Sequence, residues 1–369
     1  MNEKDGNLAA PPLNNPGVKQ PVEDAQPVFA DLAPDQLLDA VESTGLRVSG
    51  AFLALNSYEN RVYRIDLSES PIADQAFPKI AAQPSQHQPV RVVAKFYRPG
   101  RWSAEQILEE HRFTQQLAEG ELPVIAPLAD RQGRTLFEES GHRFALYPNV
   151  GGRAPELDNP DQLEQIGRLV GRIHGVGATE KFDHRVAITP ARLGDASRET
   201  VLQNQLLPDY LKESYASISA LLLEMVRQAF ERTGEVRQIR LHGDLHPGNL
   251  LWTDAGPHLV DFDDAVMGPA IQDLWMFLSG DRHYRNARLG DLLVGYEQFR
   301  EFDARELNLI EPLRTLRMIH HVAWIALRWQ DPAFPIAFPA VGSSGFWEGH
   351  INTLQEQEEL LRQPALVWD

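Results

Sequence analysis

The chain has 369 residues, and 35 basic against 52 acidic side chains give it a formal net charge of −17. This length allows two domains, or two lobes of one enzyme, and the absence of cysteine excludes disulfides, thiolate metal sites and a cysteine nucleophile. The negative charge opposes binding to phosphate backbones, so we expect no nucleic-acid partner. The first 20 residues lack the apolar stretch of a secretory signal, and no run of about 18 uncharged apolar residues follows. We therefore expect a cytoplasmic protein without a membrane partner.

The N-terminal part of the sequence predicts a tail followed by a helix and two strands. Residues 1–28 are rich in proline and poor in large apolar side chains, which is typical of a disordered tail. Pro34 is suited to a first helical turn and Gly45 to the end of that helix. Apolar and β-branched residues over 51–55 and 62–67 then predict two strands.

A proline-rich connection, 68–89, separates these strands from the next one, which is expected at 90–97. We expect the connection to be exposed and mobile. Ser103 is a suitable N-cap for the long helix that follows, and further strands are expected at 123–128 and 144–147. This part of the chain is therefore predicted to be mostly sheet with one long helix.

Beyond the last of these strands, apolar residues recur at helical spacing and strands become rare. The spacing is clearest over 163–173, 218–230 and 313–329. The sequence therefore predicts an α+β protein with two lobes. The smaller, of sheet and helix, is expected over 29–148, and the larger, mainly helical lobe over 149–369.

The motif richest in polar side chains runs from Leu241 to Asn249 and reads Leu-His-Gly-Asp-Leu-His-Pro-Gly-Asn. A predicted turn brings the chain back, and the next strand ends at Asp261. The side chains of Asp244, Asn249 and Asp261 are thereby expected to meet at one end of a hairpin. Oxygen ligands of this kind suit Mg²⁺, and a carboxylate that does not bind the metal can accept a proton from an attacking hydroxyl.

This arrangement resembles the catalytic loop and metal-binding strand of the kinase-like phosphotransferases, in which Asn follows a catalytic Asp by five residues and Asp-Phe-Gly comes next. Gly243 and Asp263 stand where protein kinases have Arg and Gly, as in the aminoglycoside phosphotransferase and choline kinase relatives. The resemblance implies a two-lobed protein-kinase-like fold that uses ATP and Mg²⁺. It also implies that Asp244 is the catalytic base and that Asn249 and Asp261 hold the metal. Asp261 thereby belongs to the catalytic set as well.

The same resemblance suggests residues that bind ATP. Lys95, in a predicted strand, stands where these enzymes place the lysine that contacts the α- and β-phosphates. Glu110 is the candidate for its ion-pair partner, with Glu105 and Glu109 as alternatives on the same predicted helix. Ser57 lies in the turn expected to cover the phosphates and would contribute a hydroxyl or amide there. That turn has no glycine, so its backbone cannot approach ATP as freely as a glycine-rich loop.

Further segments, among them 56–63, 95–99, 106–111 and 268–275, resemble a bacterial group of stress-related Ser/Thr protein kinases within this family. The resemblance implies a cytoplasmic, monomeric enzyme whose partners are ATP and a protein acceptor, with the enzyme itself among the candidate acceptors. Two alternatives stay open: a kinase of a small hydroxylated molecule, and a nucleotide-binding scaffold without turnover. The acidity of the chain favours cationic acceptors.

Several neighbouring residues have two interpretations. His242 and His246 could ligate zinc, or could only shape the catalytic loop. Asp263 could bind a second metal ion or be a solvated acid. Asp273 lies near the start of a predicted helix, where the family resemblance gives it the role of steadying the catalytic loop. His174 is expected to be a packed histidine.

Two features of the C-terminal half complete the expectations. Only three residues separate Asp264 from Gly268, which leaves no room for a long activation segment, so we expect no activation by phosphorylation there. A group of polar and aromatic residues at helical spacing is expected to be buried core: His320, His321, Trp324, Arg328 and Trp329.

Overall fold

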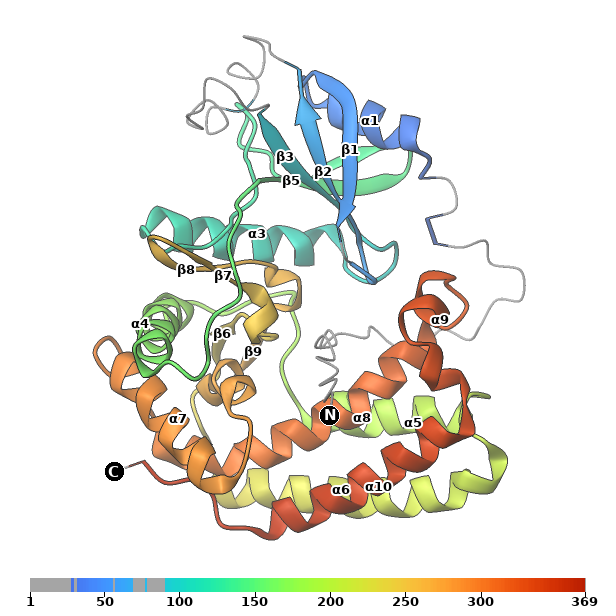
Figure 1. Ribbon diagram of the computed structural model, residues 1–369, viewed down its shortest axis with the longest axis vertical. Coiled ribbons are helices and arrows are strands. Elements are labelled where there is room, and N and C mark those ends of the chain that lie inside the picture. Colours follow the sequence, from blue (N-terminus) through green and yellow to red (C-terminus); the bar gives the residue numbers. More distant parts are fainter. Residues whose placement is uncertain (1–27, 30–31, 56, 69–76, 78–89, 369) are drawn as a thin grey trace, which may run out of the picture.

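The computed structural model describes residues 28–29, 32–55, 57–68, 77 and 90–368. The expected tail and the proline-rich connection therefore lie almost wholly outside the described residues. The described chain forms two lobes, a small one built around a sheet and a larger helical one (Figure 1). The expected two-lobed α+β architecture is confirmed.

The small lobe is a five-stranded antiparallel sheet with one helix on each face. Its elements are α1 (Pro34–Ser43), β1 (Val48–Leu55), β2 (Arg61–Leu67), β3 (Arg91–Phe96), α3 (Ala104–Glu119), β4 (Phe137–Glu139) and β5 (His142–Pro148). The strand order is β1-β2-β3-β5-β4. Because side chains alternate between the two faces of a strand, one face packs against α1 and the other against α3. Figure 1 shows α3 lying between the sheet and the large lobe.

Local signals predicted both helices of this lobe. Helix α1 begins at Pro34, as expected. Helix α3 begins after Ser103, whose hydroxyl accepts a hydrogen bond from the Gln106 amide at 3.2 Å. The Gln106 side chain in turn accepts a hydrogen bond from the Ser103 amide at 3.0 Å. This reciprocal cap satisfies donors that the start of a helix otherwise leaves unpaired.

One expected strand is wrong. Residues 123–128 form only an isolated bridge at Val124, because two prolines in this stretch have no amide hydrogen to give to a ladder. The strand beside β5 is instead β4, which the sequence interpretation missed. Ser140 and Gly141 both have positive φ, the conformation of a two-residue hairpin turn, and they join β4 directly to β5.

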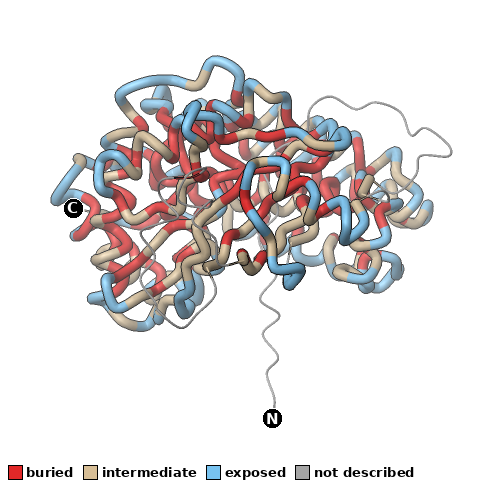
Figure 2. Tube along the Cα trace, turned by 90° about the horizontal axis from the view of Figure 1, so that it is seen from above, coloured by how far each residue is buried: buried red, intermediate tan, exposed pale blue. Residues whose placement is uncertain are grey.

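The large lobe is mainly helical and carries two short strand pairs on its side of the interface. Its helices are α4 (Pro160–Gly177), α5 (Ala196–Gln203), α6 (Lys212–Thr233), α7 (Arg282–Tyr296), α8 (Ile310–Leu327), α9 (Ala333–Ala337) and α10 (Ser344–Arg362). Its strands are β6 (Ile239–Leu241), β7 (Leu250–Thr253), β8 (Gly256–Leu259) and β9 (Val266–Gly268). β6 pairs with β9 and β7 with β8. Figure 2 shows buried positions running through the interior of the molecule and exposed ones on its outer loops. Within the described ranges, no helix combines the length and apolar character needed to cross a membrane.

Helices α4 and α7 approach each other so closely that their contact requires glycine. A Cβ atom on Gly167 would lie 1.9 Å from the carbonyl oxygen of Leu292, and one on Gly295 would lie 2.0 Å from the carbonyl oxygen of Glu164. Both distances are far inside van der Waals contact, so a side chain would push the helices apart. Because α4 also carries His174, which contacts the Asp273 carboxylate that binds the loop of the polar motif, this packing helps to position the site.

We expect Gly167→Ala to destabilise the protein by about 3 kcal/mol, the upper end of the usual cost of overpacking. The measurement is the free energy of unfolding in urea. Gly175→Ala in the same helix is the control, because a Cβ atom there meets nothing within 4 Å and alanine has the higher helix propensity. Equal stability of the two variants would show that the α4–α7 contact does not depend on glycine.

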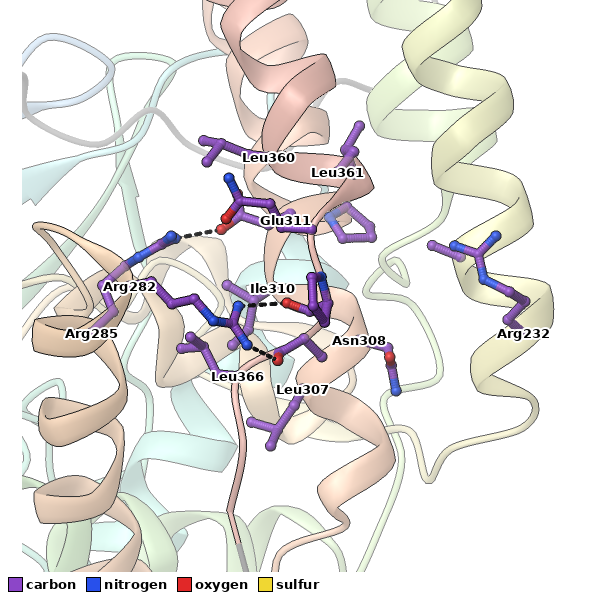
Figure 3. Close-up of a pocket in the computed structure, with 15 residues that line it drawn as sticks. Arg232, Arg282, Arg285, Leu307, Asn308, Ile310, Glu311, Leu360, Leu361 and Leu366 are labelled. Atoms are coloured by element: carbon purple, nitrogen blue, oxygen red, sulfur yellow. Dashed lines mark hydrogen bonds and ion pairs between the residues drawn. The ribbon is translucent and has the colours of Figure 1, made fainter.

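The segment after α10 lies against α7 and α8, over a small cavity of about 70 Å³ (Figure 3). Arg282 of α7 donates hydrogen bonds to the carbonyl oxygens of Pro364 and Ala365, both at 2.6 Å. Arg285, further along α7, forms a 2.6 Å ion pair with Glu311 of α8. The hydrogen bonds of Arg282 fasten the C-terminal segment to α7, and the ion pair joins α7 to α8. None of these residues lines the cleft between the lobes.

Candidate active site

A cleft of about 590 Å³ lies between the two lobes and contains the polar motif identified in the sequence. The small lobe contributes the turn after β1, together with β3 and β5, and the large lobe contributes the motif and α8. Of the residues expected to bind ATP or metal or to act as base, all but Glu110 line this cleft: Ser57, Lys95, Asp244, Asn249 and Asp261.

A buried carboxylate holds the loop that carries Asp244. Asp273 is fully buried and accepts hydrogen bonds from the amides of His242 and Gly243, each at 2.8 Å. His174 of α4 is also fully buried, and its ring lies 3.1 Å from the same carboxylate. Asp273 therefore steadies this loop, as the family resemblance implied, and His174 is a packed residue, as expected.

The backbone enters the left-handed region at Gly243, within the motif, and at Asp261, after the next strand. Gly243 has a φ of 86°, and a Cβ atom there would lie 2.2 Å from the carbonyl oxygen of Asp264. Only glycine fits this crossing of two segments, so an arginine cannot stand here as it does in protein kinases. Asp261 has a φ of 61°, a conformation that Asp tolerates better than most residues. Its side chain is 54% exposed and lines the cleft.

Asn249 and Asp261 offer the oxygen atoms that a Mg²⁺ ion needs. The amide nitrogen of Asn249 donates a hydrogen bond to the backbone oxygen of Asp244 at 2.9 Å, which leaves the amide oxygen for a cation. The half-exposed carboxylate of Asp261 is available as a second ligand. One carboxylate and one amide oxygen match the preference of Mg²⁺ for few protein ligands together with water and phosphate. The donor set therefore fits the ion.

Lys95 lies directly beside Asp261. Its ammonium nitrogen is 2.7 Å from Oδ1 of Asp261 and 3.2 Å from Oδ1 of Asp263. Burial alone would lower the pKa of Lys95, but the two carboxylates raise that pKa above its ordinary value. The lysine is therefore charged at physiological pH and lies in the cleft where it can bind phosphate.

The ion pair expected between Lys95 and Glu110 is not formed in the structure. Glu110 is 1% exposed, and burial raises its pKa to about 7 in spite of the attraction of Lys95. Of the two alternatives, Glu109 accepts hydrogen bonds from the backbone amides of residues 183–185 at 2.6, 2.9 and 2.8 Å. Glu105 is exposed in the first turn of α3. The partners of the lysine are instead the two aspartates that follow β8.

Asp263 is the centre of a buried ion cluster. Its carboxylate contacts the Arg101 guanidinium, the Lys95 ammonium at 3.2 Å and the Asn60 amide at 3.1 Å. Burial alone would raise the pKa of Asp263, but Arg101 and Lys95 hold it well below its ordinary value. Arg101 also contacts Asp264 at 2.6 Å. A carboxylate engaged in this way is suited to joining the lobes and not to binding a second metal ion.

The geometry does not support the zinc alternative. One ring nitrogen of His242 lies 2.8 Å from the Val260 backbone oxygen, and the other accepts a hydrogen bond from the Asp244 amide at 3.3 Å. His246 accepts a hydrogen bond from the Gly248 amide at 3.0 Å. In the part of the chain that the structure describes, no three His, Cys, Asp or Glu side chains gather as a metal site. Both histidines therefore shape the loop.

Arg317 of α8 belongs to the site but was missed by the sequence interpretation. Its guanidinium forms a 2.7 Å ion pair with Oδ1 of Asp244, and the two side chains are only 13% and 8% exposed. The two residues are 73 positions apart in the sequence, so no local signal predicts this contact, which only the fold creates. Arg185 was missed in the same way. It donates hydrogen bonds to the backbone oxygens of Asp263 and Ala265 at 2.6 and 3.1 Å and so fixes the segment after β8.

The connection after Asp264 is as short as the sequence indicated. Strand β9 begins at Val266 and pairs with β6 directly behind the motif. Among the described residues there is accordingly no long activation segment at this position.

The two lobes, the cleft between them and the order of its residues define a kinase-like fold. Among solved structures, amicoumacin kinase hAmiN in complex with AMP-PNP, Ca²⁺ and Ami superposes with a TM-score of 0.65 at 17% identity, covering 90% of this chain and 95% of that one. A microcompartment-associated aminopropanol kinase superposes with a TM-score of 0.63 at 17% identity, covering 88% of this chain and 98% of that one. At these identities the comparison shows the fold.

Sequence comparison shows the family. The model of the phosphotransferase enzyme family matches residues 56–310. Stress response kinase A of Escherichia coli O157:H7 is 42% identical over 338 residues, which cover 92% of this chain and 96% of that protein. The serine/threonine protein kinase RdoA of Salmonella typhimurium strain LT2 is 40% identical over 338 residues, with the same coverage. The chain therefore belongs to the phosphotransferase enzyme family.

The buried carboxyl of Glu110 predicts a pH dependence of stability. Its pKa is raised from 4.5 to about 7, so the folded protein retains a proton that the unfolded chain releases. The stabilisation is full below pH 4.5 and is lost as the pH rises through 7. At about 1.36 kcal/mol per pKa unit, the loss approaches about 3 kcal/mol.

Urea unfolding of the wild type and of Glu110→Gln across this pH range isolates the contribution, because the glutamine does not titrate. The wild type should lose stability relative to the variant as the pH rises. The same pH slope in both proteins would contradict a protonated Glu110.

Proposed function

We propose that this protein is an ATP- and Mg²⁺-dependent Ser/Thr protein kinase of a stress response, which transfers the γ-phosphate of ATP to a hydroxyl group. The observation that carries the proposal is the convergence of Asp244, Lys95 and Asp261 in one cleft, where Lys95 lies 2.7 Å from Asp261. The 42% identity to stress response kinase A over 92% of the chain supports a role in stress, and the 40% identity to the serine/threonine protein kinase RdoA supports a protein acceptor. The AMP-PNP in the complex of the amicoumacin kinase, which has the same fold, supports the nucleotide.

In this mechanism the residues of the cleft orient the reactants. The buried ammonium group of Lys95 would bind oxygens of the α- and β-phosphates, and the turn at Ser57 would cover them. Asn249 and Asp261 would hold Mg²⁺, which when bound supplies neutralisation of phosphate charge. Asp244 would accept the proton of the acceptor hydroxyl as its oxygen attacks the γ-phosphate. Glu110 would act on the lysine only at longer range, because the two do not form an ion pair.

Arg317 would orient the proposed base. Its guanidinium engages Oδ1 of Asp244 at 2.7 Å, which leaves Oδ2 to receive the proton. The imidazole of His246 lies 3.7 Å from Oδ2 and borders the same position. The carboxylate would therefore face the acceptor in one orientation, which lowers the entropic cost of reaching a reactive geometry.

A kinase of a small hydroxylated molecule is the second candidate. It is favoured by the short connection between Asp264 and β9, which leaves the acceptor side of the motif without an activation segment to hold a peptide. A scaffold without turnover is less favoured, because every group that the proposed transfer requires is present in the cleft. We also propose that the enzyme is cytoplasmic, as the family resemblance implies. We propose that it acts as a monomer, since one chain supplies all of these groups.

Asp244→Asn is expected to lower the rate of transfer by about 10²–10⁴-fold, the usual contribution of a general base, while nucleotide binding is retained. Asp261→Asn should weaken the binding of Mg²⁺ and ATP as well. The assay incubates the purified protein with labelled ATP and Mg²⁺ alone, with a generic protein acceptor, and with panels of aminoglycosides and amino alcohols.

Label on Ser or Thr of a protein, lost in Asp244→Asn, is the expected result. Label on a small molecule alone would select the second candidate. Turnover at the wild-type rate in Asp244→Asn would contradict the assignment of the base.

Arg317→Ala is expected to lower kcat by about tenfold or more with little change in the KM for ATP, because it removes an interaction that orients the base and not the nucleotide. Arg317→Lys should recover part of the loss, since the ammonium group can still reach Asp244. Steady-state kinetics with varied ATP measures both constants. A rise in KM at unchanged kcat would show that Arg317 serves the nucleotide instead.

A further inference from the structure

The turn between β1 and β2 contacts the large lobe at consecutive positions. Its described residues, 57–60, all line the cleft, and none is glycine. The ring of Tyr58 packs against that of Phe338 with a centroid distance of 5.3 Å. The amide of Asn60 donates a hydrogen bond to Asp263 at 3.1 Å. The residue between them reaches α8.

That residue, Glu59, is 6% exposed and is bound by the end of α8. Its Oε2 lies 2.7 Å from Nε of Arg328, the C-cap of the helix, and accepts a hydrogen bond from the indole of Trp324 at 2.5 Å. Its Oε1 lies 3.6 Å from Nε of Arg98. Trp324 and Arg328 are buried, as the sequence predicted, but they also hold the turn.

A second set of contacts joins the same parts of the two lobes. Arg98, which follows β3, forms a 2.8 Å ion pair with Asp331 beyond α8, and Arg61 of β2 lies 3.4 Å from the same carboxylate. The backbone amide of Arg98 also donates a hydrogen bond to the side-chain oxygen of Asn60 at 3.1 Å. The turn, β2 and the end of β3 are thus all fixed to the segment at the end of α8.

These contacts give the turn a fixed place over the cleft. A glycine-rich loop follows a nucleotide because its backbone is free to adapt, whereas residues 57–60 lack that freedom. A turn that is already held in place loses less conformational entropy when a ligand binds beneath it. A glycine-rich loop covers the nucleotide by adapting its backbone. Here the side chains that bind the other lobe can instead hold the turn in a covering position.

We propose that Glu59 is a positioning residue for the nucleotide, which holds the turn closed over the phosphates by binding Arg328 and Trp324 of the opposite lobe. The inference rests on the proposed function in that the ligand of the cleft is a nucleotide. It goes beyond that function because it assigns the position of the turn to Glu59, which is neither the proposed base nor a proposed metal ligand.

The test is calorimetric binding of ADP in the presence of Mg²⁺, with the wild type, Glu59→Gln, Arg328→Gln and the double variant. We expect Glu59→Gln to weaken ADP binding about tenfold, and the double variant to be little weaker than either single one, because the two residues act through one contact. In turnover assays, KM for ATP should rise about tenfold while kcat changes by less than about threefold. Trp324→Phe removes the N–H donor of the indole together with part of its buried ring, so its free energy of unfolding is measured as well. Because the contact with Arg328 remains, we expect a smaller loss of ADP affinity than in Glu59→Gln.

Glu311→Gln is the matched control. It breaks the 2.6 Å ion pair with Arg285 in the large lobe, outside the cleft, and should lower stability without changing ADP affinity. Equal ADP affinity of the wild type and of folded Glu59→Gln and Trp324→Phe would overturn the inference alone. A wild type that does not bind ADP would overturn the inference together with the proposed function.

Discussion

The two lobes depend on the buried carboxylate of Asp263. Three groups from separate parts of the small lobe converge on it: the ammonium of Lys95, the guanidinium of Arg101 and the amide of Asn60. Breaking one side of a buried ion pair strands the other charge and commonly costs about 3–5 kcal/mol, so the cluster is retained or lost as a unit. Because Lys95 contacts both Asp263 and Asp261, the cluster also fixes the lysine beside Asp261 in the cleft. The lobes are thus parts of one unit and not independent domains.

The net charge of −17 describes the surface and is a poor guide to the cleft. There, three carboxylates each form an ion pair with a basic side chain: Asp244 with Arg317, Asp261 with Lys95, and Glu59 with Arg328. Because each acid is matched locally, the site can hold a polyphosphate although the chain as a whole is acidic. The expectation that acidity favours cationic acceptors therefore finds no support at the proposed base, where the nearest partner is itself a cation.

The sequence predicted what is encoded locally. Helix caps, the order of the lobes and the motif from Asp244 to Asp261 depend on neighbouring residues, and the structure brings the predicted ligands into one cleft. Strand β4 was missed because it has three residues, too few for a periodic pattern. The partners of Lys95 and Asp244 were missed for another reason. Several carboxylates or arginines in the sequence could pair with each of these charges. Which one does so depends on the burial and the neighbouring charges of the site, and these are set only when distant elements pack together.

The three residues between Asp264 and Gly268 also bear on how such an enzyme is controlled. Where a long segment must be modified before the motif assembles, a cell can store the protein in an inactive form. Here the chain enters β9 almost at once, and its backbone is held by Arg185, so in the described chain no long segment stands between Asp264 and this strand. On the proposed function, an activating modification at this point of the chain would therefore have no long segment to rearrange.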